Sequence, residues 1–219
     1  MALQYQQALG VGATRVSAWS ALLDQINVFP LADADTGRNL VVTLSPLRRM
    51  EGDVKKICRD LLFSARGNSG NIAARFFHEF IQTDSLEHLP SALRKGRDQA
   101  WLAVKDPRPG TMLSFFDALA DSCREAPGEA TPLWVHNVLE HAGKAVRETA
   151  EIQPVLKKAG VLDAGALGMF LFFDGFLNAL AGCPDAFRPL PALFEPKLTI
   201  APSFQHEVRS GFCVDAVVR

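Results

Sequence analysis

The stretch AGALGMFLFFDGFLNALAGC, residues 164–183, has the composition of a helix that lies inside a protein core. It is apolar and about as long as a membrane span. Asp174, Gly175 and Asn178 lie near its middle, however, and an aspartate at the centre of a bilayer costs roughly 2.5 to 3.5 kcal/mol. No cluster of basic or aromatic anchors flanks the stretch. We therefore predict a buried core helix in a chain that is not transmembrane.

Helical periodicity extends through most of the preceding chain. Val16, Trp19, Leu23 and Ile26 recur with the spacing of one helical face, and Pro46 is expected to kink or shorten the next helix. Further helices are predicted over residues 36–50, 54–62, 68–80, 93–103, 111–125 and 135–146. Strand-like alternation is almost absent, so the predicted fold class is all-α, an antiparallel bundle of about eight helices.

The character of the sequence changes after Cys183. Five prolines fall within the next twenty residues, which favours an extended, Pro-rich linker over a helix. We therefore place a domain boundary between residues 1–182 and 183–219. Residues 212–218, FCVDAVV, predict a single strand that would open a following domain.

Composition narrows the classes of function. A length of 219 residues suits one hydrophobic core, and a formal net charge of −1 provides no positive field for nucleic acid. The four cysteines are far apart and form no C-x-x-C pair, which indicates reduced thiols. Residues 1–10 lack the pattern of a signal peptide. We therefore expect a cytoplasmic protein that does not bind nucleic acid.

The first loop with chemical potential is NVFPLADADTGRN, residues 27–39. Asp33 and Asp35 lie two positions apart before a predicted helix, with the hydroxyl of Thr36 and the amide of Asn39 close by. Oxygen donors of this kind suit a hard cation such as magnesium. Asp35 or Thr36 could instead cap the helix, and on spacing alone the cap is the favoured interpretation.

The second loop is SARGNSGN, residues 64–71. Gly67 and Gly70 flank Asn68 and Ser69, and glycines let a backbone approach a phosphate closely at a helix start. Arg66 could offset phosphate charge or lie in solvent. A glycine that ends one helix and an Asn or Ser that caps the next would explain the loop equally well.

Two later loops are also polar entries into helices. They read DPRPGT over residues 106–111 and KKAGVLDAGALG over residues 157–168. Each loop alone is better explained as a capped turn. In an antiparallel bundle, however, loops that precede alternate helices gather at one end, where the positive helix ends can converge on one polyphosphate.

Taken in order, the four loops resemble the signature of the DhaL-type kinase domain, as it occurs in bacterial fatty acid kinase A subunits and in dihydroxyacetone kinases. The loops of that family read close to N-x-F-P-V-P-D-G-D-T-G-x-N, A-R-G-N-S-G, E-G-T and L-K-K-A-G-V-V-D-A-G. The resemblance covers roughly residues 14–182. It implies an eight-helix barrel that binds ATP or ADP at one end through two Mg²⁺ ions, without a Walker A loop.

The resemblance also assigns roles to individual residues. It makes Asp33 and Asp35 the metal ligands and the catalytic carboxylates. It places Thr36 and Asn39 beside the phosphates, Asn68, Ser69 and Gly70 in the phosphate-binding turn, and Thr111, Asp163 and Gly165 along the nucleotide pocket. Dihydroxyacetone kinases carry a further aspartate before the two that match here. In this chain that region reads Asn27-Val28-Phe29, which favours the fatty acid branch.

The chain departs from the family pattern at several positions. Ala34 replaces a glycine between the two aspartates, and an added methyl group could cost on the order of 1 kcal/mol if the backbone has a positive φ there. Ala32 replaces a proline, Pro109 stands before Gly110 where the family usually has a glutamate, and Ala166 and Leu167 replace a Gly-Gln pair. Both metal carboxylates are present, so these changes predict reduced or altered activity rather than a lost site.

The resemblance implies a partner as well. In fatty acid kinases a DegV-like lipid-binding protein presents the fatty acid carboxylate, which is converted to an acyl phosphate. Nothing in this chain resembles that fold, so we expect the acceptor on a separate or fused DegV-like protein, and a following domain could also form a homodimer. Two alternatives stay open, a dihydroxyacetone-type kinase subunit and a non-catalytic nucleotide-binding scaffold.

Overall fold

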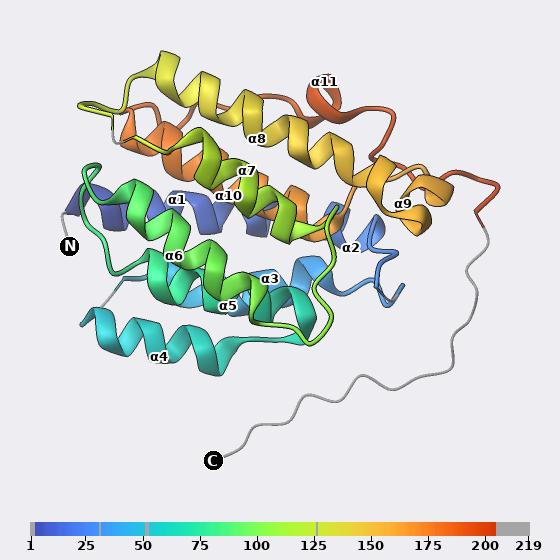
Figure 1. The fold of residues 1–219 in the computed structure, drawn as a ribbon, viewed down its shortest axis with the longest axis horizontal. Coiled ribbons are helices and arrows are strands. Elements are labelled where there is room, and N and C mark those ends of the chain that lie inside the picture. Colours follow the sequence, from blue (N-terminus) through green and yellow to red (C-terminus); the bar gives the residue numbers. More distant parts are fainter. Residues whose placement is uncertain (1–2, 31, 51–52, 126, 205–219) are drawn as a thin grey trace.

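A computed structural model describes residues 3–30, 32–50, 53–125 and 127–204 (Figure 1). Within these ranges the chain forms eleven α-helices and no strand, which confirms the predicted all-α class. In chain order the helices are α1 (Leu3–Ala18), α2 (Ser20–Gln25), α3 (Thr36–Arg48), α4 (Val54–Ser64), α5 (Gly67–Phe80), α6 (Leu89–Trp101), α7 (Met112–Ser122), α8 (Pro132–Ile152), α9 (Pro154–Ala159), α10 (Ala164–Leu180) and α11 (Leu190–Phe194).

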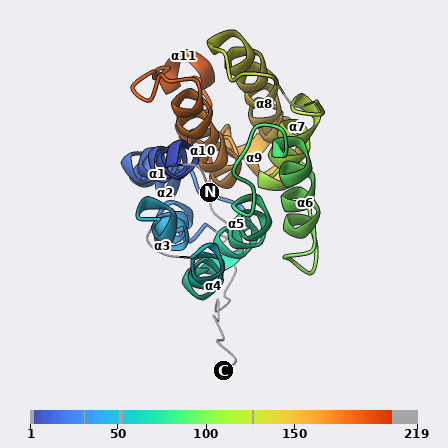
Figure 2. The same cartoon turned by 90° about the vertical axis from the view of Figure 1, so that its left-hand side faces the viewer.

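The longer helices form an antiparallel bundle. In Figure 1, α1, α3, α4, α5, α6, α7, α8 and α10 run along one axis and alternate in direction. Seen end-on, they close into a ring, in which α10 packs against α1, α3, α7 and α8 (Figure 2). The short helices α2 and α9 lie in connections between longer helices, and the short helix α11 follows α10. This arrangement agrees with the predicted eight-helix bundle.

Helix α10 is the core helix that the sequence predicted. Every residue from Ala164 to Leu177 is buried. Its phenylalanines join rings from α5 and α7 in one cluster, which contains Phe76, Phe77, Phe80, Phe115, Phe116, Phe172, Phe173 and Phe176. Phe76 and Phe116 stack with their ring centroids 3.9 Å apart. Among the helices of the described ranges, none combines the length and the apolarity needed to cross a membrane.

The buried aspartate of α10 is neutralised inside the bundle. Asp174 is 3% exposed and forms an ion pair with Arg15 of α1. Asn178 donates from Nδ2 to Asp174 Oδ1 at 3.1 Å. Burial raises the pKa of Asp174, and the Arg15 guanidinium opposes that rise. The charge that disfavours a membrane span therefore ties α10 to α1.

The first predicted helix is divided in two. Helix α1 ends at Ala18, α2 begins at Ser20, and Trp19 lies between them. The break brings the Ser20 carbonyl against Gly37 at the start of α3, where there is no room for a β-carbon. The tertiary contact with α3, which the periodicity of α1 does not encode, therefore accounts for the division.

Helix α3 continues through Pro46 and ends at Arg48, two residues before the predicted end. Pro46 has no N–H to donate to the Val42 carbonyl. The hydroxyl of Ser45 donates to that carbonyl oxygen instead, at 2.8 Å. The helix is therefore slightly shorter than predicted but is not interrupted at the proline.

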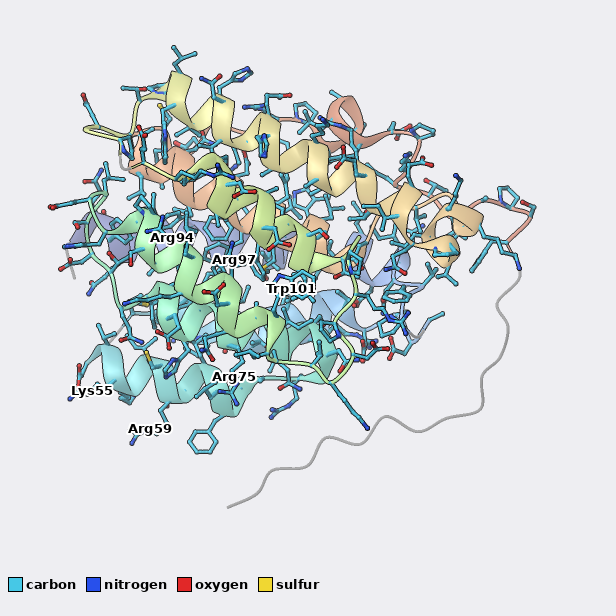
Figure 3. All side chains as sticks on the ribbon, viewed as in Figure 1. Lys55, Arg59, Arg75, Arg94, Arg97 and Trp101 are labelled. Carbon is cyan, nitrogen blue, oxygen red and sulfur yellow. The ribbon has the colours of Figure 1, made fainter. Side chains whose placement is uncertain are left out.

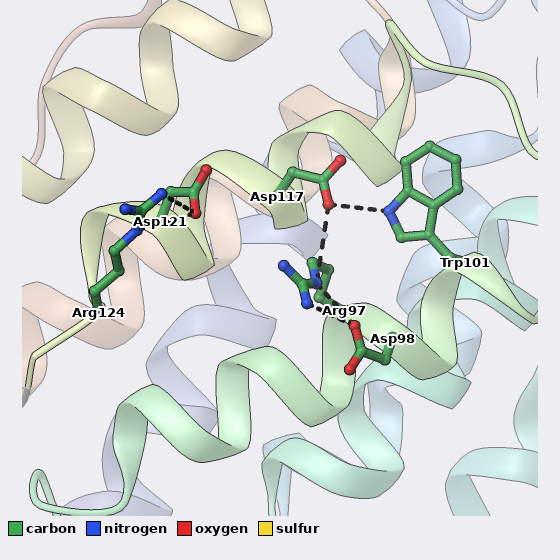
Figure 4. A network of polar contacts seen from close by, with 6 residues as sticks. All are labelled: Arg97, Asp98, Trp101, Asp117, Asp121 and Arg124. Atoms are coloured by element: carbon green, nitrogen blue, oxygen red, sulfur yellow. Dashed lines mark hydrogen bonds and ion pairs between the residues drawn. The ribbon is translucent and has the colours of Figure 1, made fainter.

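A polar network joins α6 to α7 on the outside of the ring (Figure 4). Trp101 donates from Nε1 to Asp117 Oδ1 at 3.0 Å, and Arg97 lies between Asp117 and Asp98. Burial raises the pKa of Asp117, although both Trp101 and Arg97 stabilise its charged form. The network fixes the two helices that precede and follow the third loop.

The proline-rich segment follows an irregular path but is not free of the domain. It contains α11, in which Leu190 and Phe194 are buried, and Phe194 packs edge-on against Phe170 at 5.1 Å between centroids. Ala201 donates its backbone N–H to the Ala159 carbonyl at 2.8 Å. The boundary after residue 182 stays a prediction, and the predicted strand at 212–218 lies outside the described residues.

We predict that Gly12→Ala destabilises the bundle. A β-carbon at Gly12 would lie 2.7 Å from the Phe172 carbonyl oxygen, and a backbone oxygen cannot swing away as a flexible side chain can. The free energy of unfolding, measured in urea, should fall by about 1 to 3 kcal/mol.

Gly143→Ala in α8 is the matched control. The atom nearest to a β-carbon there is in the Phe170 ring at 3.4 Å, which is an ordinary contact. This variant should keep or gain stability, by up to about 1 kcal/mol, because alanine favours a helix more than glycine does. Equal losses in the two variants would contradict the close α1–α10 packing.

Candidate functional site

The four predicted loops lie at one end of the bundle. Helices α3, α5, α7 and α10 all begin at the end that is on the right in Figure 1. The first two loops are adjacent, since α3 packs against α5, and the last two are adjacent, since α7 packs against α10. Leu40 of α3 reaches Gly168 of α10 and links the two halves.

The two carboxylates of the first loop interact with each other. Asp33 is exposed, while Asp35 is half-buried directly before α3. Burial raises the pKa of Asp35, and the nearby Asp33 raises it further, whereas a hydrogen bond from Asn39 opposes the rise. Two negative groups held together in this way favour a bound cation.

Asp35 does not cap α3. It occupies the N-cap position, but its side chain makes no capping hydrogen bond. The capping acceptor is Asp24 of α2, whose Oδ1 accepts the backbone N–H groups of Gly37 at 2.7 Å and Arg38 at 3.1 Å. The capping interpretation of Asp35 is therefore wrong.

Sequence reasoning missed Asp24 because it lies thirteen residues before Gly37, in a separate helix. Its other carboxylate oxygen, Oδ2, pairs with Arg38 Nε at 3.1 Å. Arg38 in turn donates from Nη2 to the Ala34 carbonyl at 2.7 Å. No feature of the local sequence would have revealed these contacts.

Ala34 has the left-handed backbone that the family glycine suggested. Its φ is +52°, and within the described residues it is the one residue other than glycine with a positive φ. This conformation is less favourable for an L-residue by roughly 1 to 2 kcal/mol. The strained residue stands between the two carboxylates in the sequence.

An unpaired buried atom lies beside Asp33. Asn27 is 5% exposed and donates from Nδ2 to Asp33 Oδ1 at 2.8 Å. Its own Oδ1 is buried without a hydrogen-bond partner among the described residues. A buried oxygen without a hydrogen-bond partner lowers the stability of the fold unless a donor or a cation interacts with it.

The second loop packs onto the first through α3. Gly67 has a φ of +59°. A β-carbon on this residue would lie only 2.6 Å from the amide nitrogen of Asn39, which is too close. Thr43 accepts the backbone N–H of Arg66 at its hydroxyl oxygen, 3.3 Å away. Asn39 therefore contacts both Asp35 and the first residue of α5.

The start of α5 is open. Arg66 holds the N-cap position but makes no capping hydrogen bond with its side chain. The exposed Asn68 and the half-buried Ser69 form no side-chain hydrogen bond within the described part of the chain, and Gly70 is buried against Thr43. Free backbone N–H groups and unpaired polar side chains at a helix start suit an anion.

The third and fourth loops are capped from within. Thr111 accepts the N–H of Leu113 at 3.3 Å and donates to the Arg108 carbonyl at 2.8 Å. Asp163 accepts the N–H of Ala166 at 2.7 Å and caps α10. For these two residues the capping interpretation is correct.

Asp163 also joins α7 to α10. Its carboxylate accepts backbone hydrogen bonds from Met112 at the start of α7 and from Gly165 in α10. Gly165 faces the Met112 side chain, and a β-carbon there would lie 2.8 Å from the terminal methyl group. Burial raises the pKa of Asp163 to about 6, while its backbone donors oppose the rise.

The remaining candidates can be placed relative to this geometry. Thr36 is buried in the first turn of α3, next to Asp35. Asp33, Asp35, Thr36, Asn39 and the turn of Asn68, Ser69 and Gly70 form one group, whereas Thr111, Asp163 and Gly165 form a second group across the bundle end. No set of three or more His, Cys, Asp or Glu side chains in the described ranges could hold a metal.

The donors of the first group fit magnesium better than zinc or a transition metal. They are the carboxylates of Asp33 and Asp35 and the hydroxyl of Thr36, with the unpaired amide oxygen of Asn27 beside them and no thiolate or imidazole among them. Mg²⁺ in proteins is commonly held by one or two carboxylates, and phosphate oxygens of a substrate and water complete its shell.

We predict that Asp163 makes stability depend on pH. The folded state binds its proton more tightly than the unfolded state, where the pKa is near 3.8. The contribution of Asp163 to the free energy of unfolding is therefore largest below pH 4. It falls by roughly 3 kcal/mol as the pH rises through about 6.

The change can be isolated with Asp163→Asn, which does not titrate. Urea unfolding of both proteins from pH 4 to pH 7 should show that wild type loses stability relative to the variant as the pH rises. Parallel stability curves would show that Asp163 titrates alike in the folded and unfolded chains.

Comparison with known proteins gives a family and relatives for this chain. Residues 30–178 match the family model of the DAK2 domain. Protein YloV of Bacillus subtilis is 32% identical, in an alignment that covers 98% of this chain and 43% of YloV. An uncharacterised protein of Staphylococcus saprophyticus is 32% identical, over 78% of this chain and 34% of its own length. The chain thus spans less than half of these relatives.

Solved structures show the same fold. The dihydroxyacetone kinase of C. freundii, in complex with AMP-PNP and Mg²⁺, has a TM-score of 0.58 and 18% identity over 83% of this chain and 34% of the kinase chain. Its native form has a TM-score of 0.60 and 17% identity. Together with the family match over residues 30–178, these findings show that the chain belongs to the DAK2 domain family, the DhaL-type family that its four loops predicted.

Proposed function

We propose that this domain binds ATP or ADP with Mg²⁺ and transfers a phosphoryl group to an acceptor carried by another protein or domain. One observation carries the proposal. Asp35 stands at a helix start but is released from capping by Asp24, and through Asn39 it contacts the uncapped start of α5. A free carboxylate pair beside an open helix start is an arrangement that suits a metal-bound phosphate.

The carboxylate pair would hold the metal. Asp33 and Asp35 supply the charge, and Asn27 Oδ1 and Thr36 offer neutral oxygens near them. Bound there, Mg²⁺ would offset phosphate charge and orient the phosphates for transfer. The family resemblance implies two ions. Among the described residues, Asp33 and Asp35 are the two carboxylates that we assign to the metal, because Asp24 is engaged by α3 and Arg38, so phosphate oxygens and water would have to supply most of the remaining ligands.

The turn before α5 would hold the phosphates. Among the described residues, the side chains of Asn68 and Ser69 form no hydrogen bond, and the N-cap residue Arg66 does not cap the first N–H groups of α5 with its side chain. Gly70 lets the turn lie directly on Thr43, and Gly67 provides its positive φ. The partial positive charge at the start of α5 adds to the attraction for an anion.

The second group would form the other wall of the nucleotide pocket. The polar atoms of Thr111 and Asp163 are already engaged as caps, so we assign them a shaping role rather than direct bonds to phosphate. Gly165 keeps the starts of α7 and α10 close to each other. This wall would pack against the nucleoside part of the ligand.

For the acceptor we favour a fatty acid carboxylate presented by a DegV-like protein or fused domain. The sequence Asn27-Val28-Phe29 supports this branch, because dihydroxyacetone kinases carry an additional aspartate there. A cytoplasmic location would match it, and Cys58, Cys123 and Cys183 are free thiols in the described chain. A homodimer formed through a following domain remains part of the same proposal.

A dihydroxyacetone-type kinase subunit is the second candidate. The observation in its favour is the structural similarity to the dihydroxyacetone kinase of C. freundii. That similarity is shared by both branches of the family, so it does not distinguish their acceptors. A non-catalytic scaffold is the third candidate and is favoured by the strained Ala34 between the metal carboxylates.

We predict that ADP binds only with Mg²⁺, and that Asp33→Asn and Asp35→Asn each weaken this binding by at least about a hundredfold. Without the metal the two carboxylates would repel the phosphates. Neither aspartate caps a helix, so the helical content should not change. Calorimetry of ADP binding with Mg²⁺ and with EDTA, together with circular dichroism, measures both effects.

Asp53→Asn is the control for this experiment. Asp53 caps α4 by accepting the N–H of Lys55, and asparagine is an equally good cap. This variant should bind Mg²⁺ and ADP as wild type does. Equal ADP affinity with and without Mg²⁺, or normal binding by both site variants, would refute the metal site.

We predict that the isolated domain transfers no phosphate to a free fatty acid or to free dihydroxyacetone. Positioning supplies most of the catalysis in phosphoryl transfer, and we assign the four loops to the nucleotide and the metal rather than to an acceptor. Incubation with labelled ATP should give product only when a loaded DegV-like protein or a dihydroxyacetone-binding subunit is added. Which of the two supports transfer identifies the branch, and product from the isolated domain would refute the requirement for a partner.

A further inference from the structure

We propose that Asp24 and Arg38 are positioning residues that hold the loop of Asp33 and Asp35 in its cation-binding shape. We propose further that Arg38 compensates for the alanine at position 34. This inference rests on the proposed function, because it concerns how the carboxylates of that site are kept available. Neither residue is itself a metal ligand in this proposal.

Asp24 uses both of its carboxylate oxygens on the loop. Oδ1 accepts the N–H groups of Gly37 and Arg38 at 2.7 and 3.1 Å, and Oδ2 pairs with Arg38 Nε at 3.1 Å. The Asp24 side chain is only 19% exposed, so solvent competes weakly for it. One side chain from α2 therefore caps α3 and orients the guanidinium of Arg38.

Arg38 then holds the strained residue. Its Nη2 donates to the carbonyl oxygen of Ala34, four residues earlier in the chain, at 2.7 Å. The carbonyl of Ala34 can accept this bond only while the backbone keeps its direction, and that direction depends on the left-handed φ of +52°. A glycine would adopt this conformation freely, whereas alanine needs a contact that holds it there.

Asp24 also determines whether the Asp35 side chain is needed to cap α3. The backbone N–H groups at the start of α3 require an acceptor, and Asp35 stands in the position from which a side chain normally supplies one. Because Asp24 already accepts the N–H groups of Gly37 and Arg38, the Asp35 carboxylate does not have to accept them. Removing Asp24 would let Asp35 turn to the helix and leave the cation site.

The test combines Arg38→Ala with Ala34→Gly. Calorimetry at saturating ADP gives the half-saturating Mg²⁺ concentration, and urea unfolding without ligand gives the stability. Arg38→Ala should raise the half-saturating Mg²⁺ concentration about fivefold to tenfold, and the double variant should return to within about twofold of wild type. Its urea midpoint should recover in parallel, because glycine no longer needs the contact.

Asp24→Ala and Asp24→Asn separate the two tasks of Asp24. The alanine variant loses the cap and the charge, so its half-saturating Mg²⁺ concentration should rise at least as much as that of Arg38→Ala. The asparagine variant keeps a capping acceptor and should lie between alanine and wild type. Arg75→Ala is the matched control, since Arg75 is exposed on α5 outside the loop and should have no effect (Figure 3).

Two results would overturn the inference. Arg38→Ala with unchanged Mg²⁺ dependence and stability would show that the contact to Ala34 holds nothing. Equal losses from Arg38→Ala in wild type and in the Ala34→Gly variant would show that Arg38 does not compensate for the alanine. If wild type binds no Mg²⁺ and ADP, the proposed function fails, and the coupling between positions 34 and 38 in urea unfolding still decides whether the loop is held in this way.

Discussion

The burial of α10 on every side is the constraint on which the rest of this structure depends. A helix whose residues from Ala164 to Leu177 are all buried leaves no face for polar chemistry, and its one charge is taken up by Arg15. The helices around it must present apolar faces inward, and this requirement produces the phenylalanine cluster. Polar side chains that could bind a ligand therefore lie at the ends of the bundle. The start of α10 lies at the same end as the starts of α3, α5 and α7.

At that end, the helix starts differ in how their backbone donors are satisfied. Asp24 caps α3 from α2, Thr111 caps α7, and Asp163 caps α10 while it also binds the start of α7. The start of α5 has no side-chain cap. Because a buried or half-buried donor needs an acceptor, the open start is where an external anion gains most. The same argument explains why the four loops are unequal, although each of them leads into a helix at this end.

Much of this could be predicted from sequence, and the limits have physical reasons. The apolar run of α10 and the ordered loops indicated the all-α fold and the family, because both depend on local pattern. The break at Trp19 and the packing of α11 depend on contacts with distant residues, so periodicity could not reveal them. Asp24 was missed for the same reason. The positive φ of Ala34, in contrast, was foreseen from the glycine that it replaces.

Asp35 and Asp163 show why a motif alone cannot assign a role to a carboxylate. Both stand at N-cap positions, and both have a raised pKa because of burial. Asp163 is buried and accepts three backbone hydrogen bonds, so its carboxyl group is used by the fold. Asp35 is only half-buried, another acceptor has taken its helix start, and Asp33 stands beside it. Whether such a carboxylate caps its helix or stays available for the metal-binding role that we propose for Asp35 therefore depends on whether a third residue satisfies the helix first, which is a property of the tertiary structure.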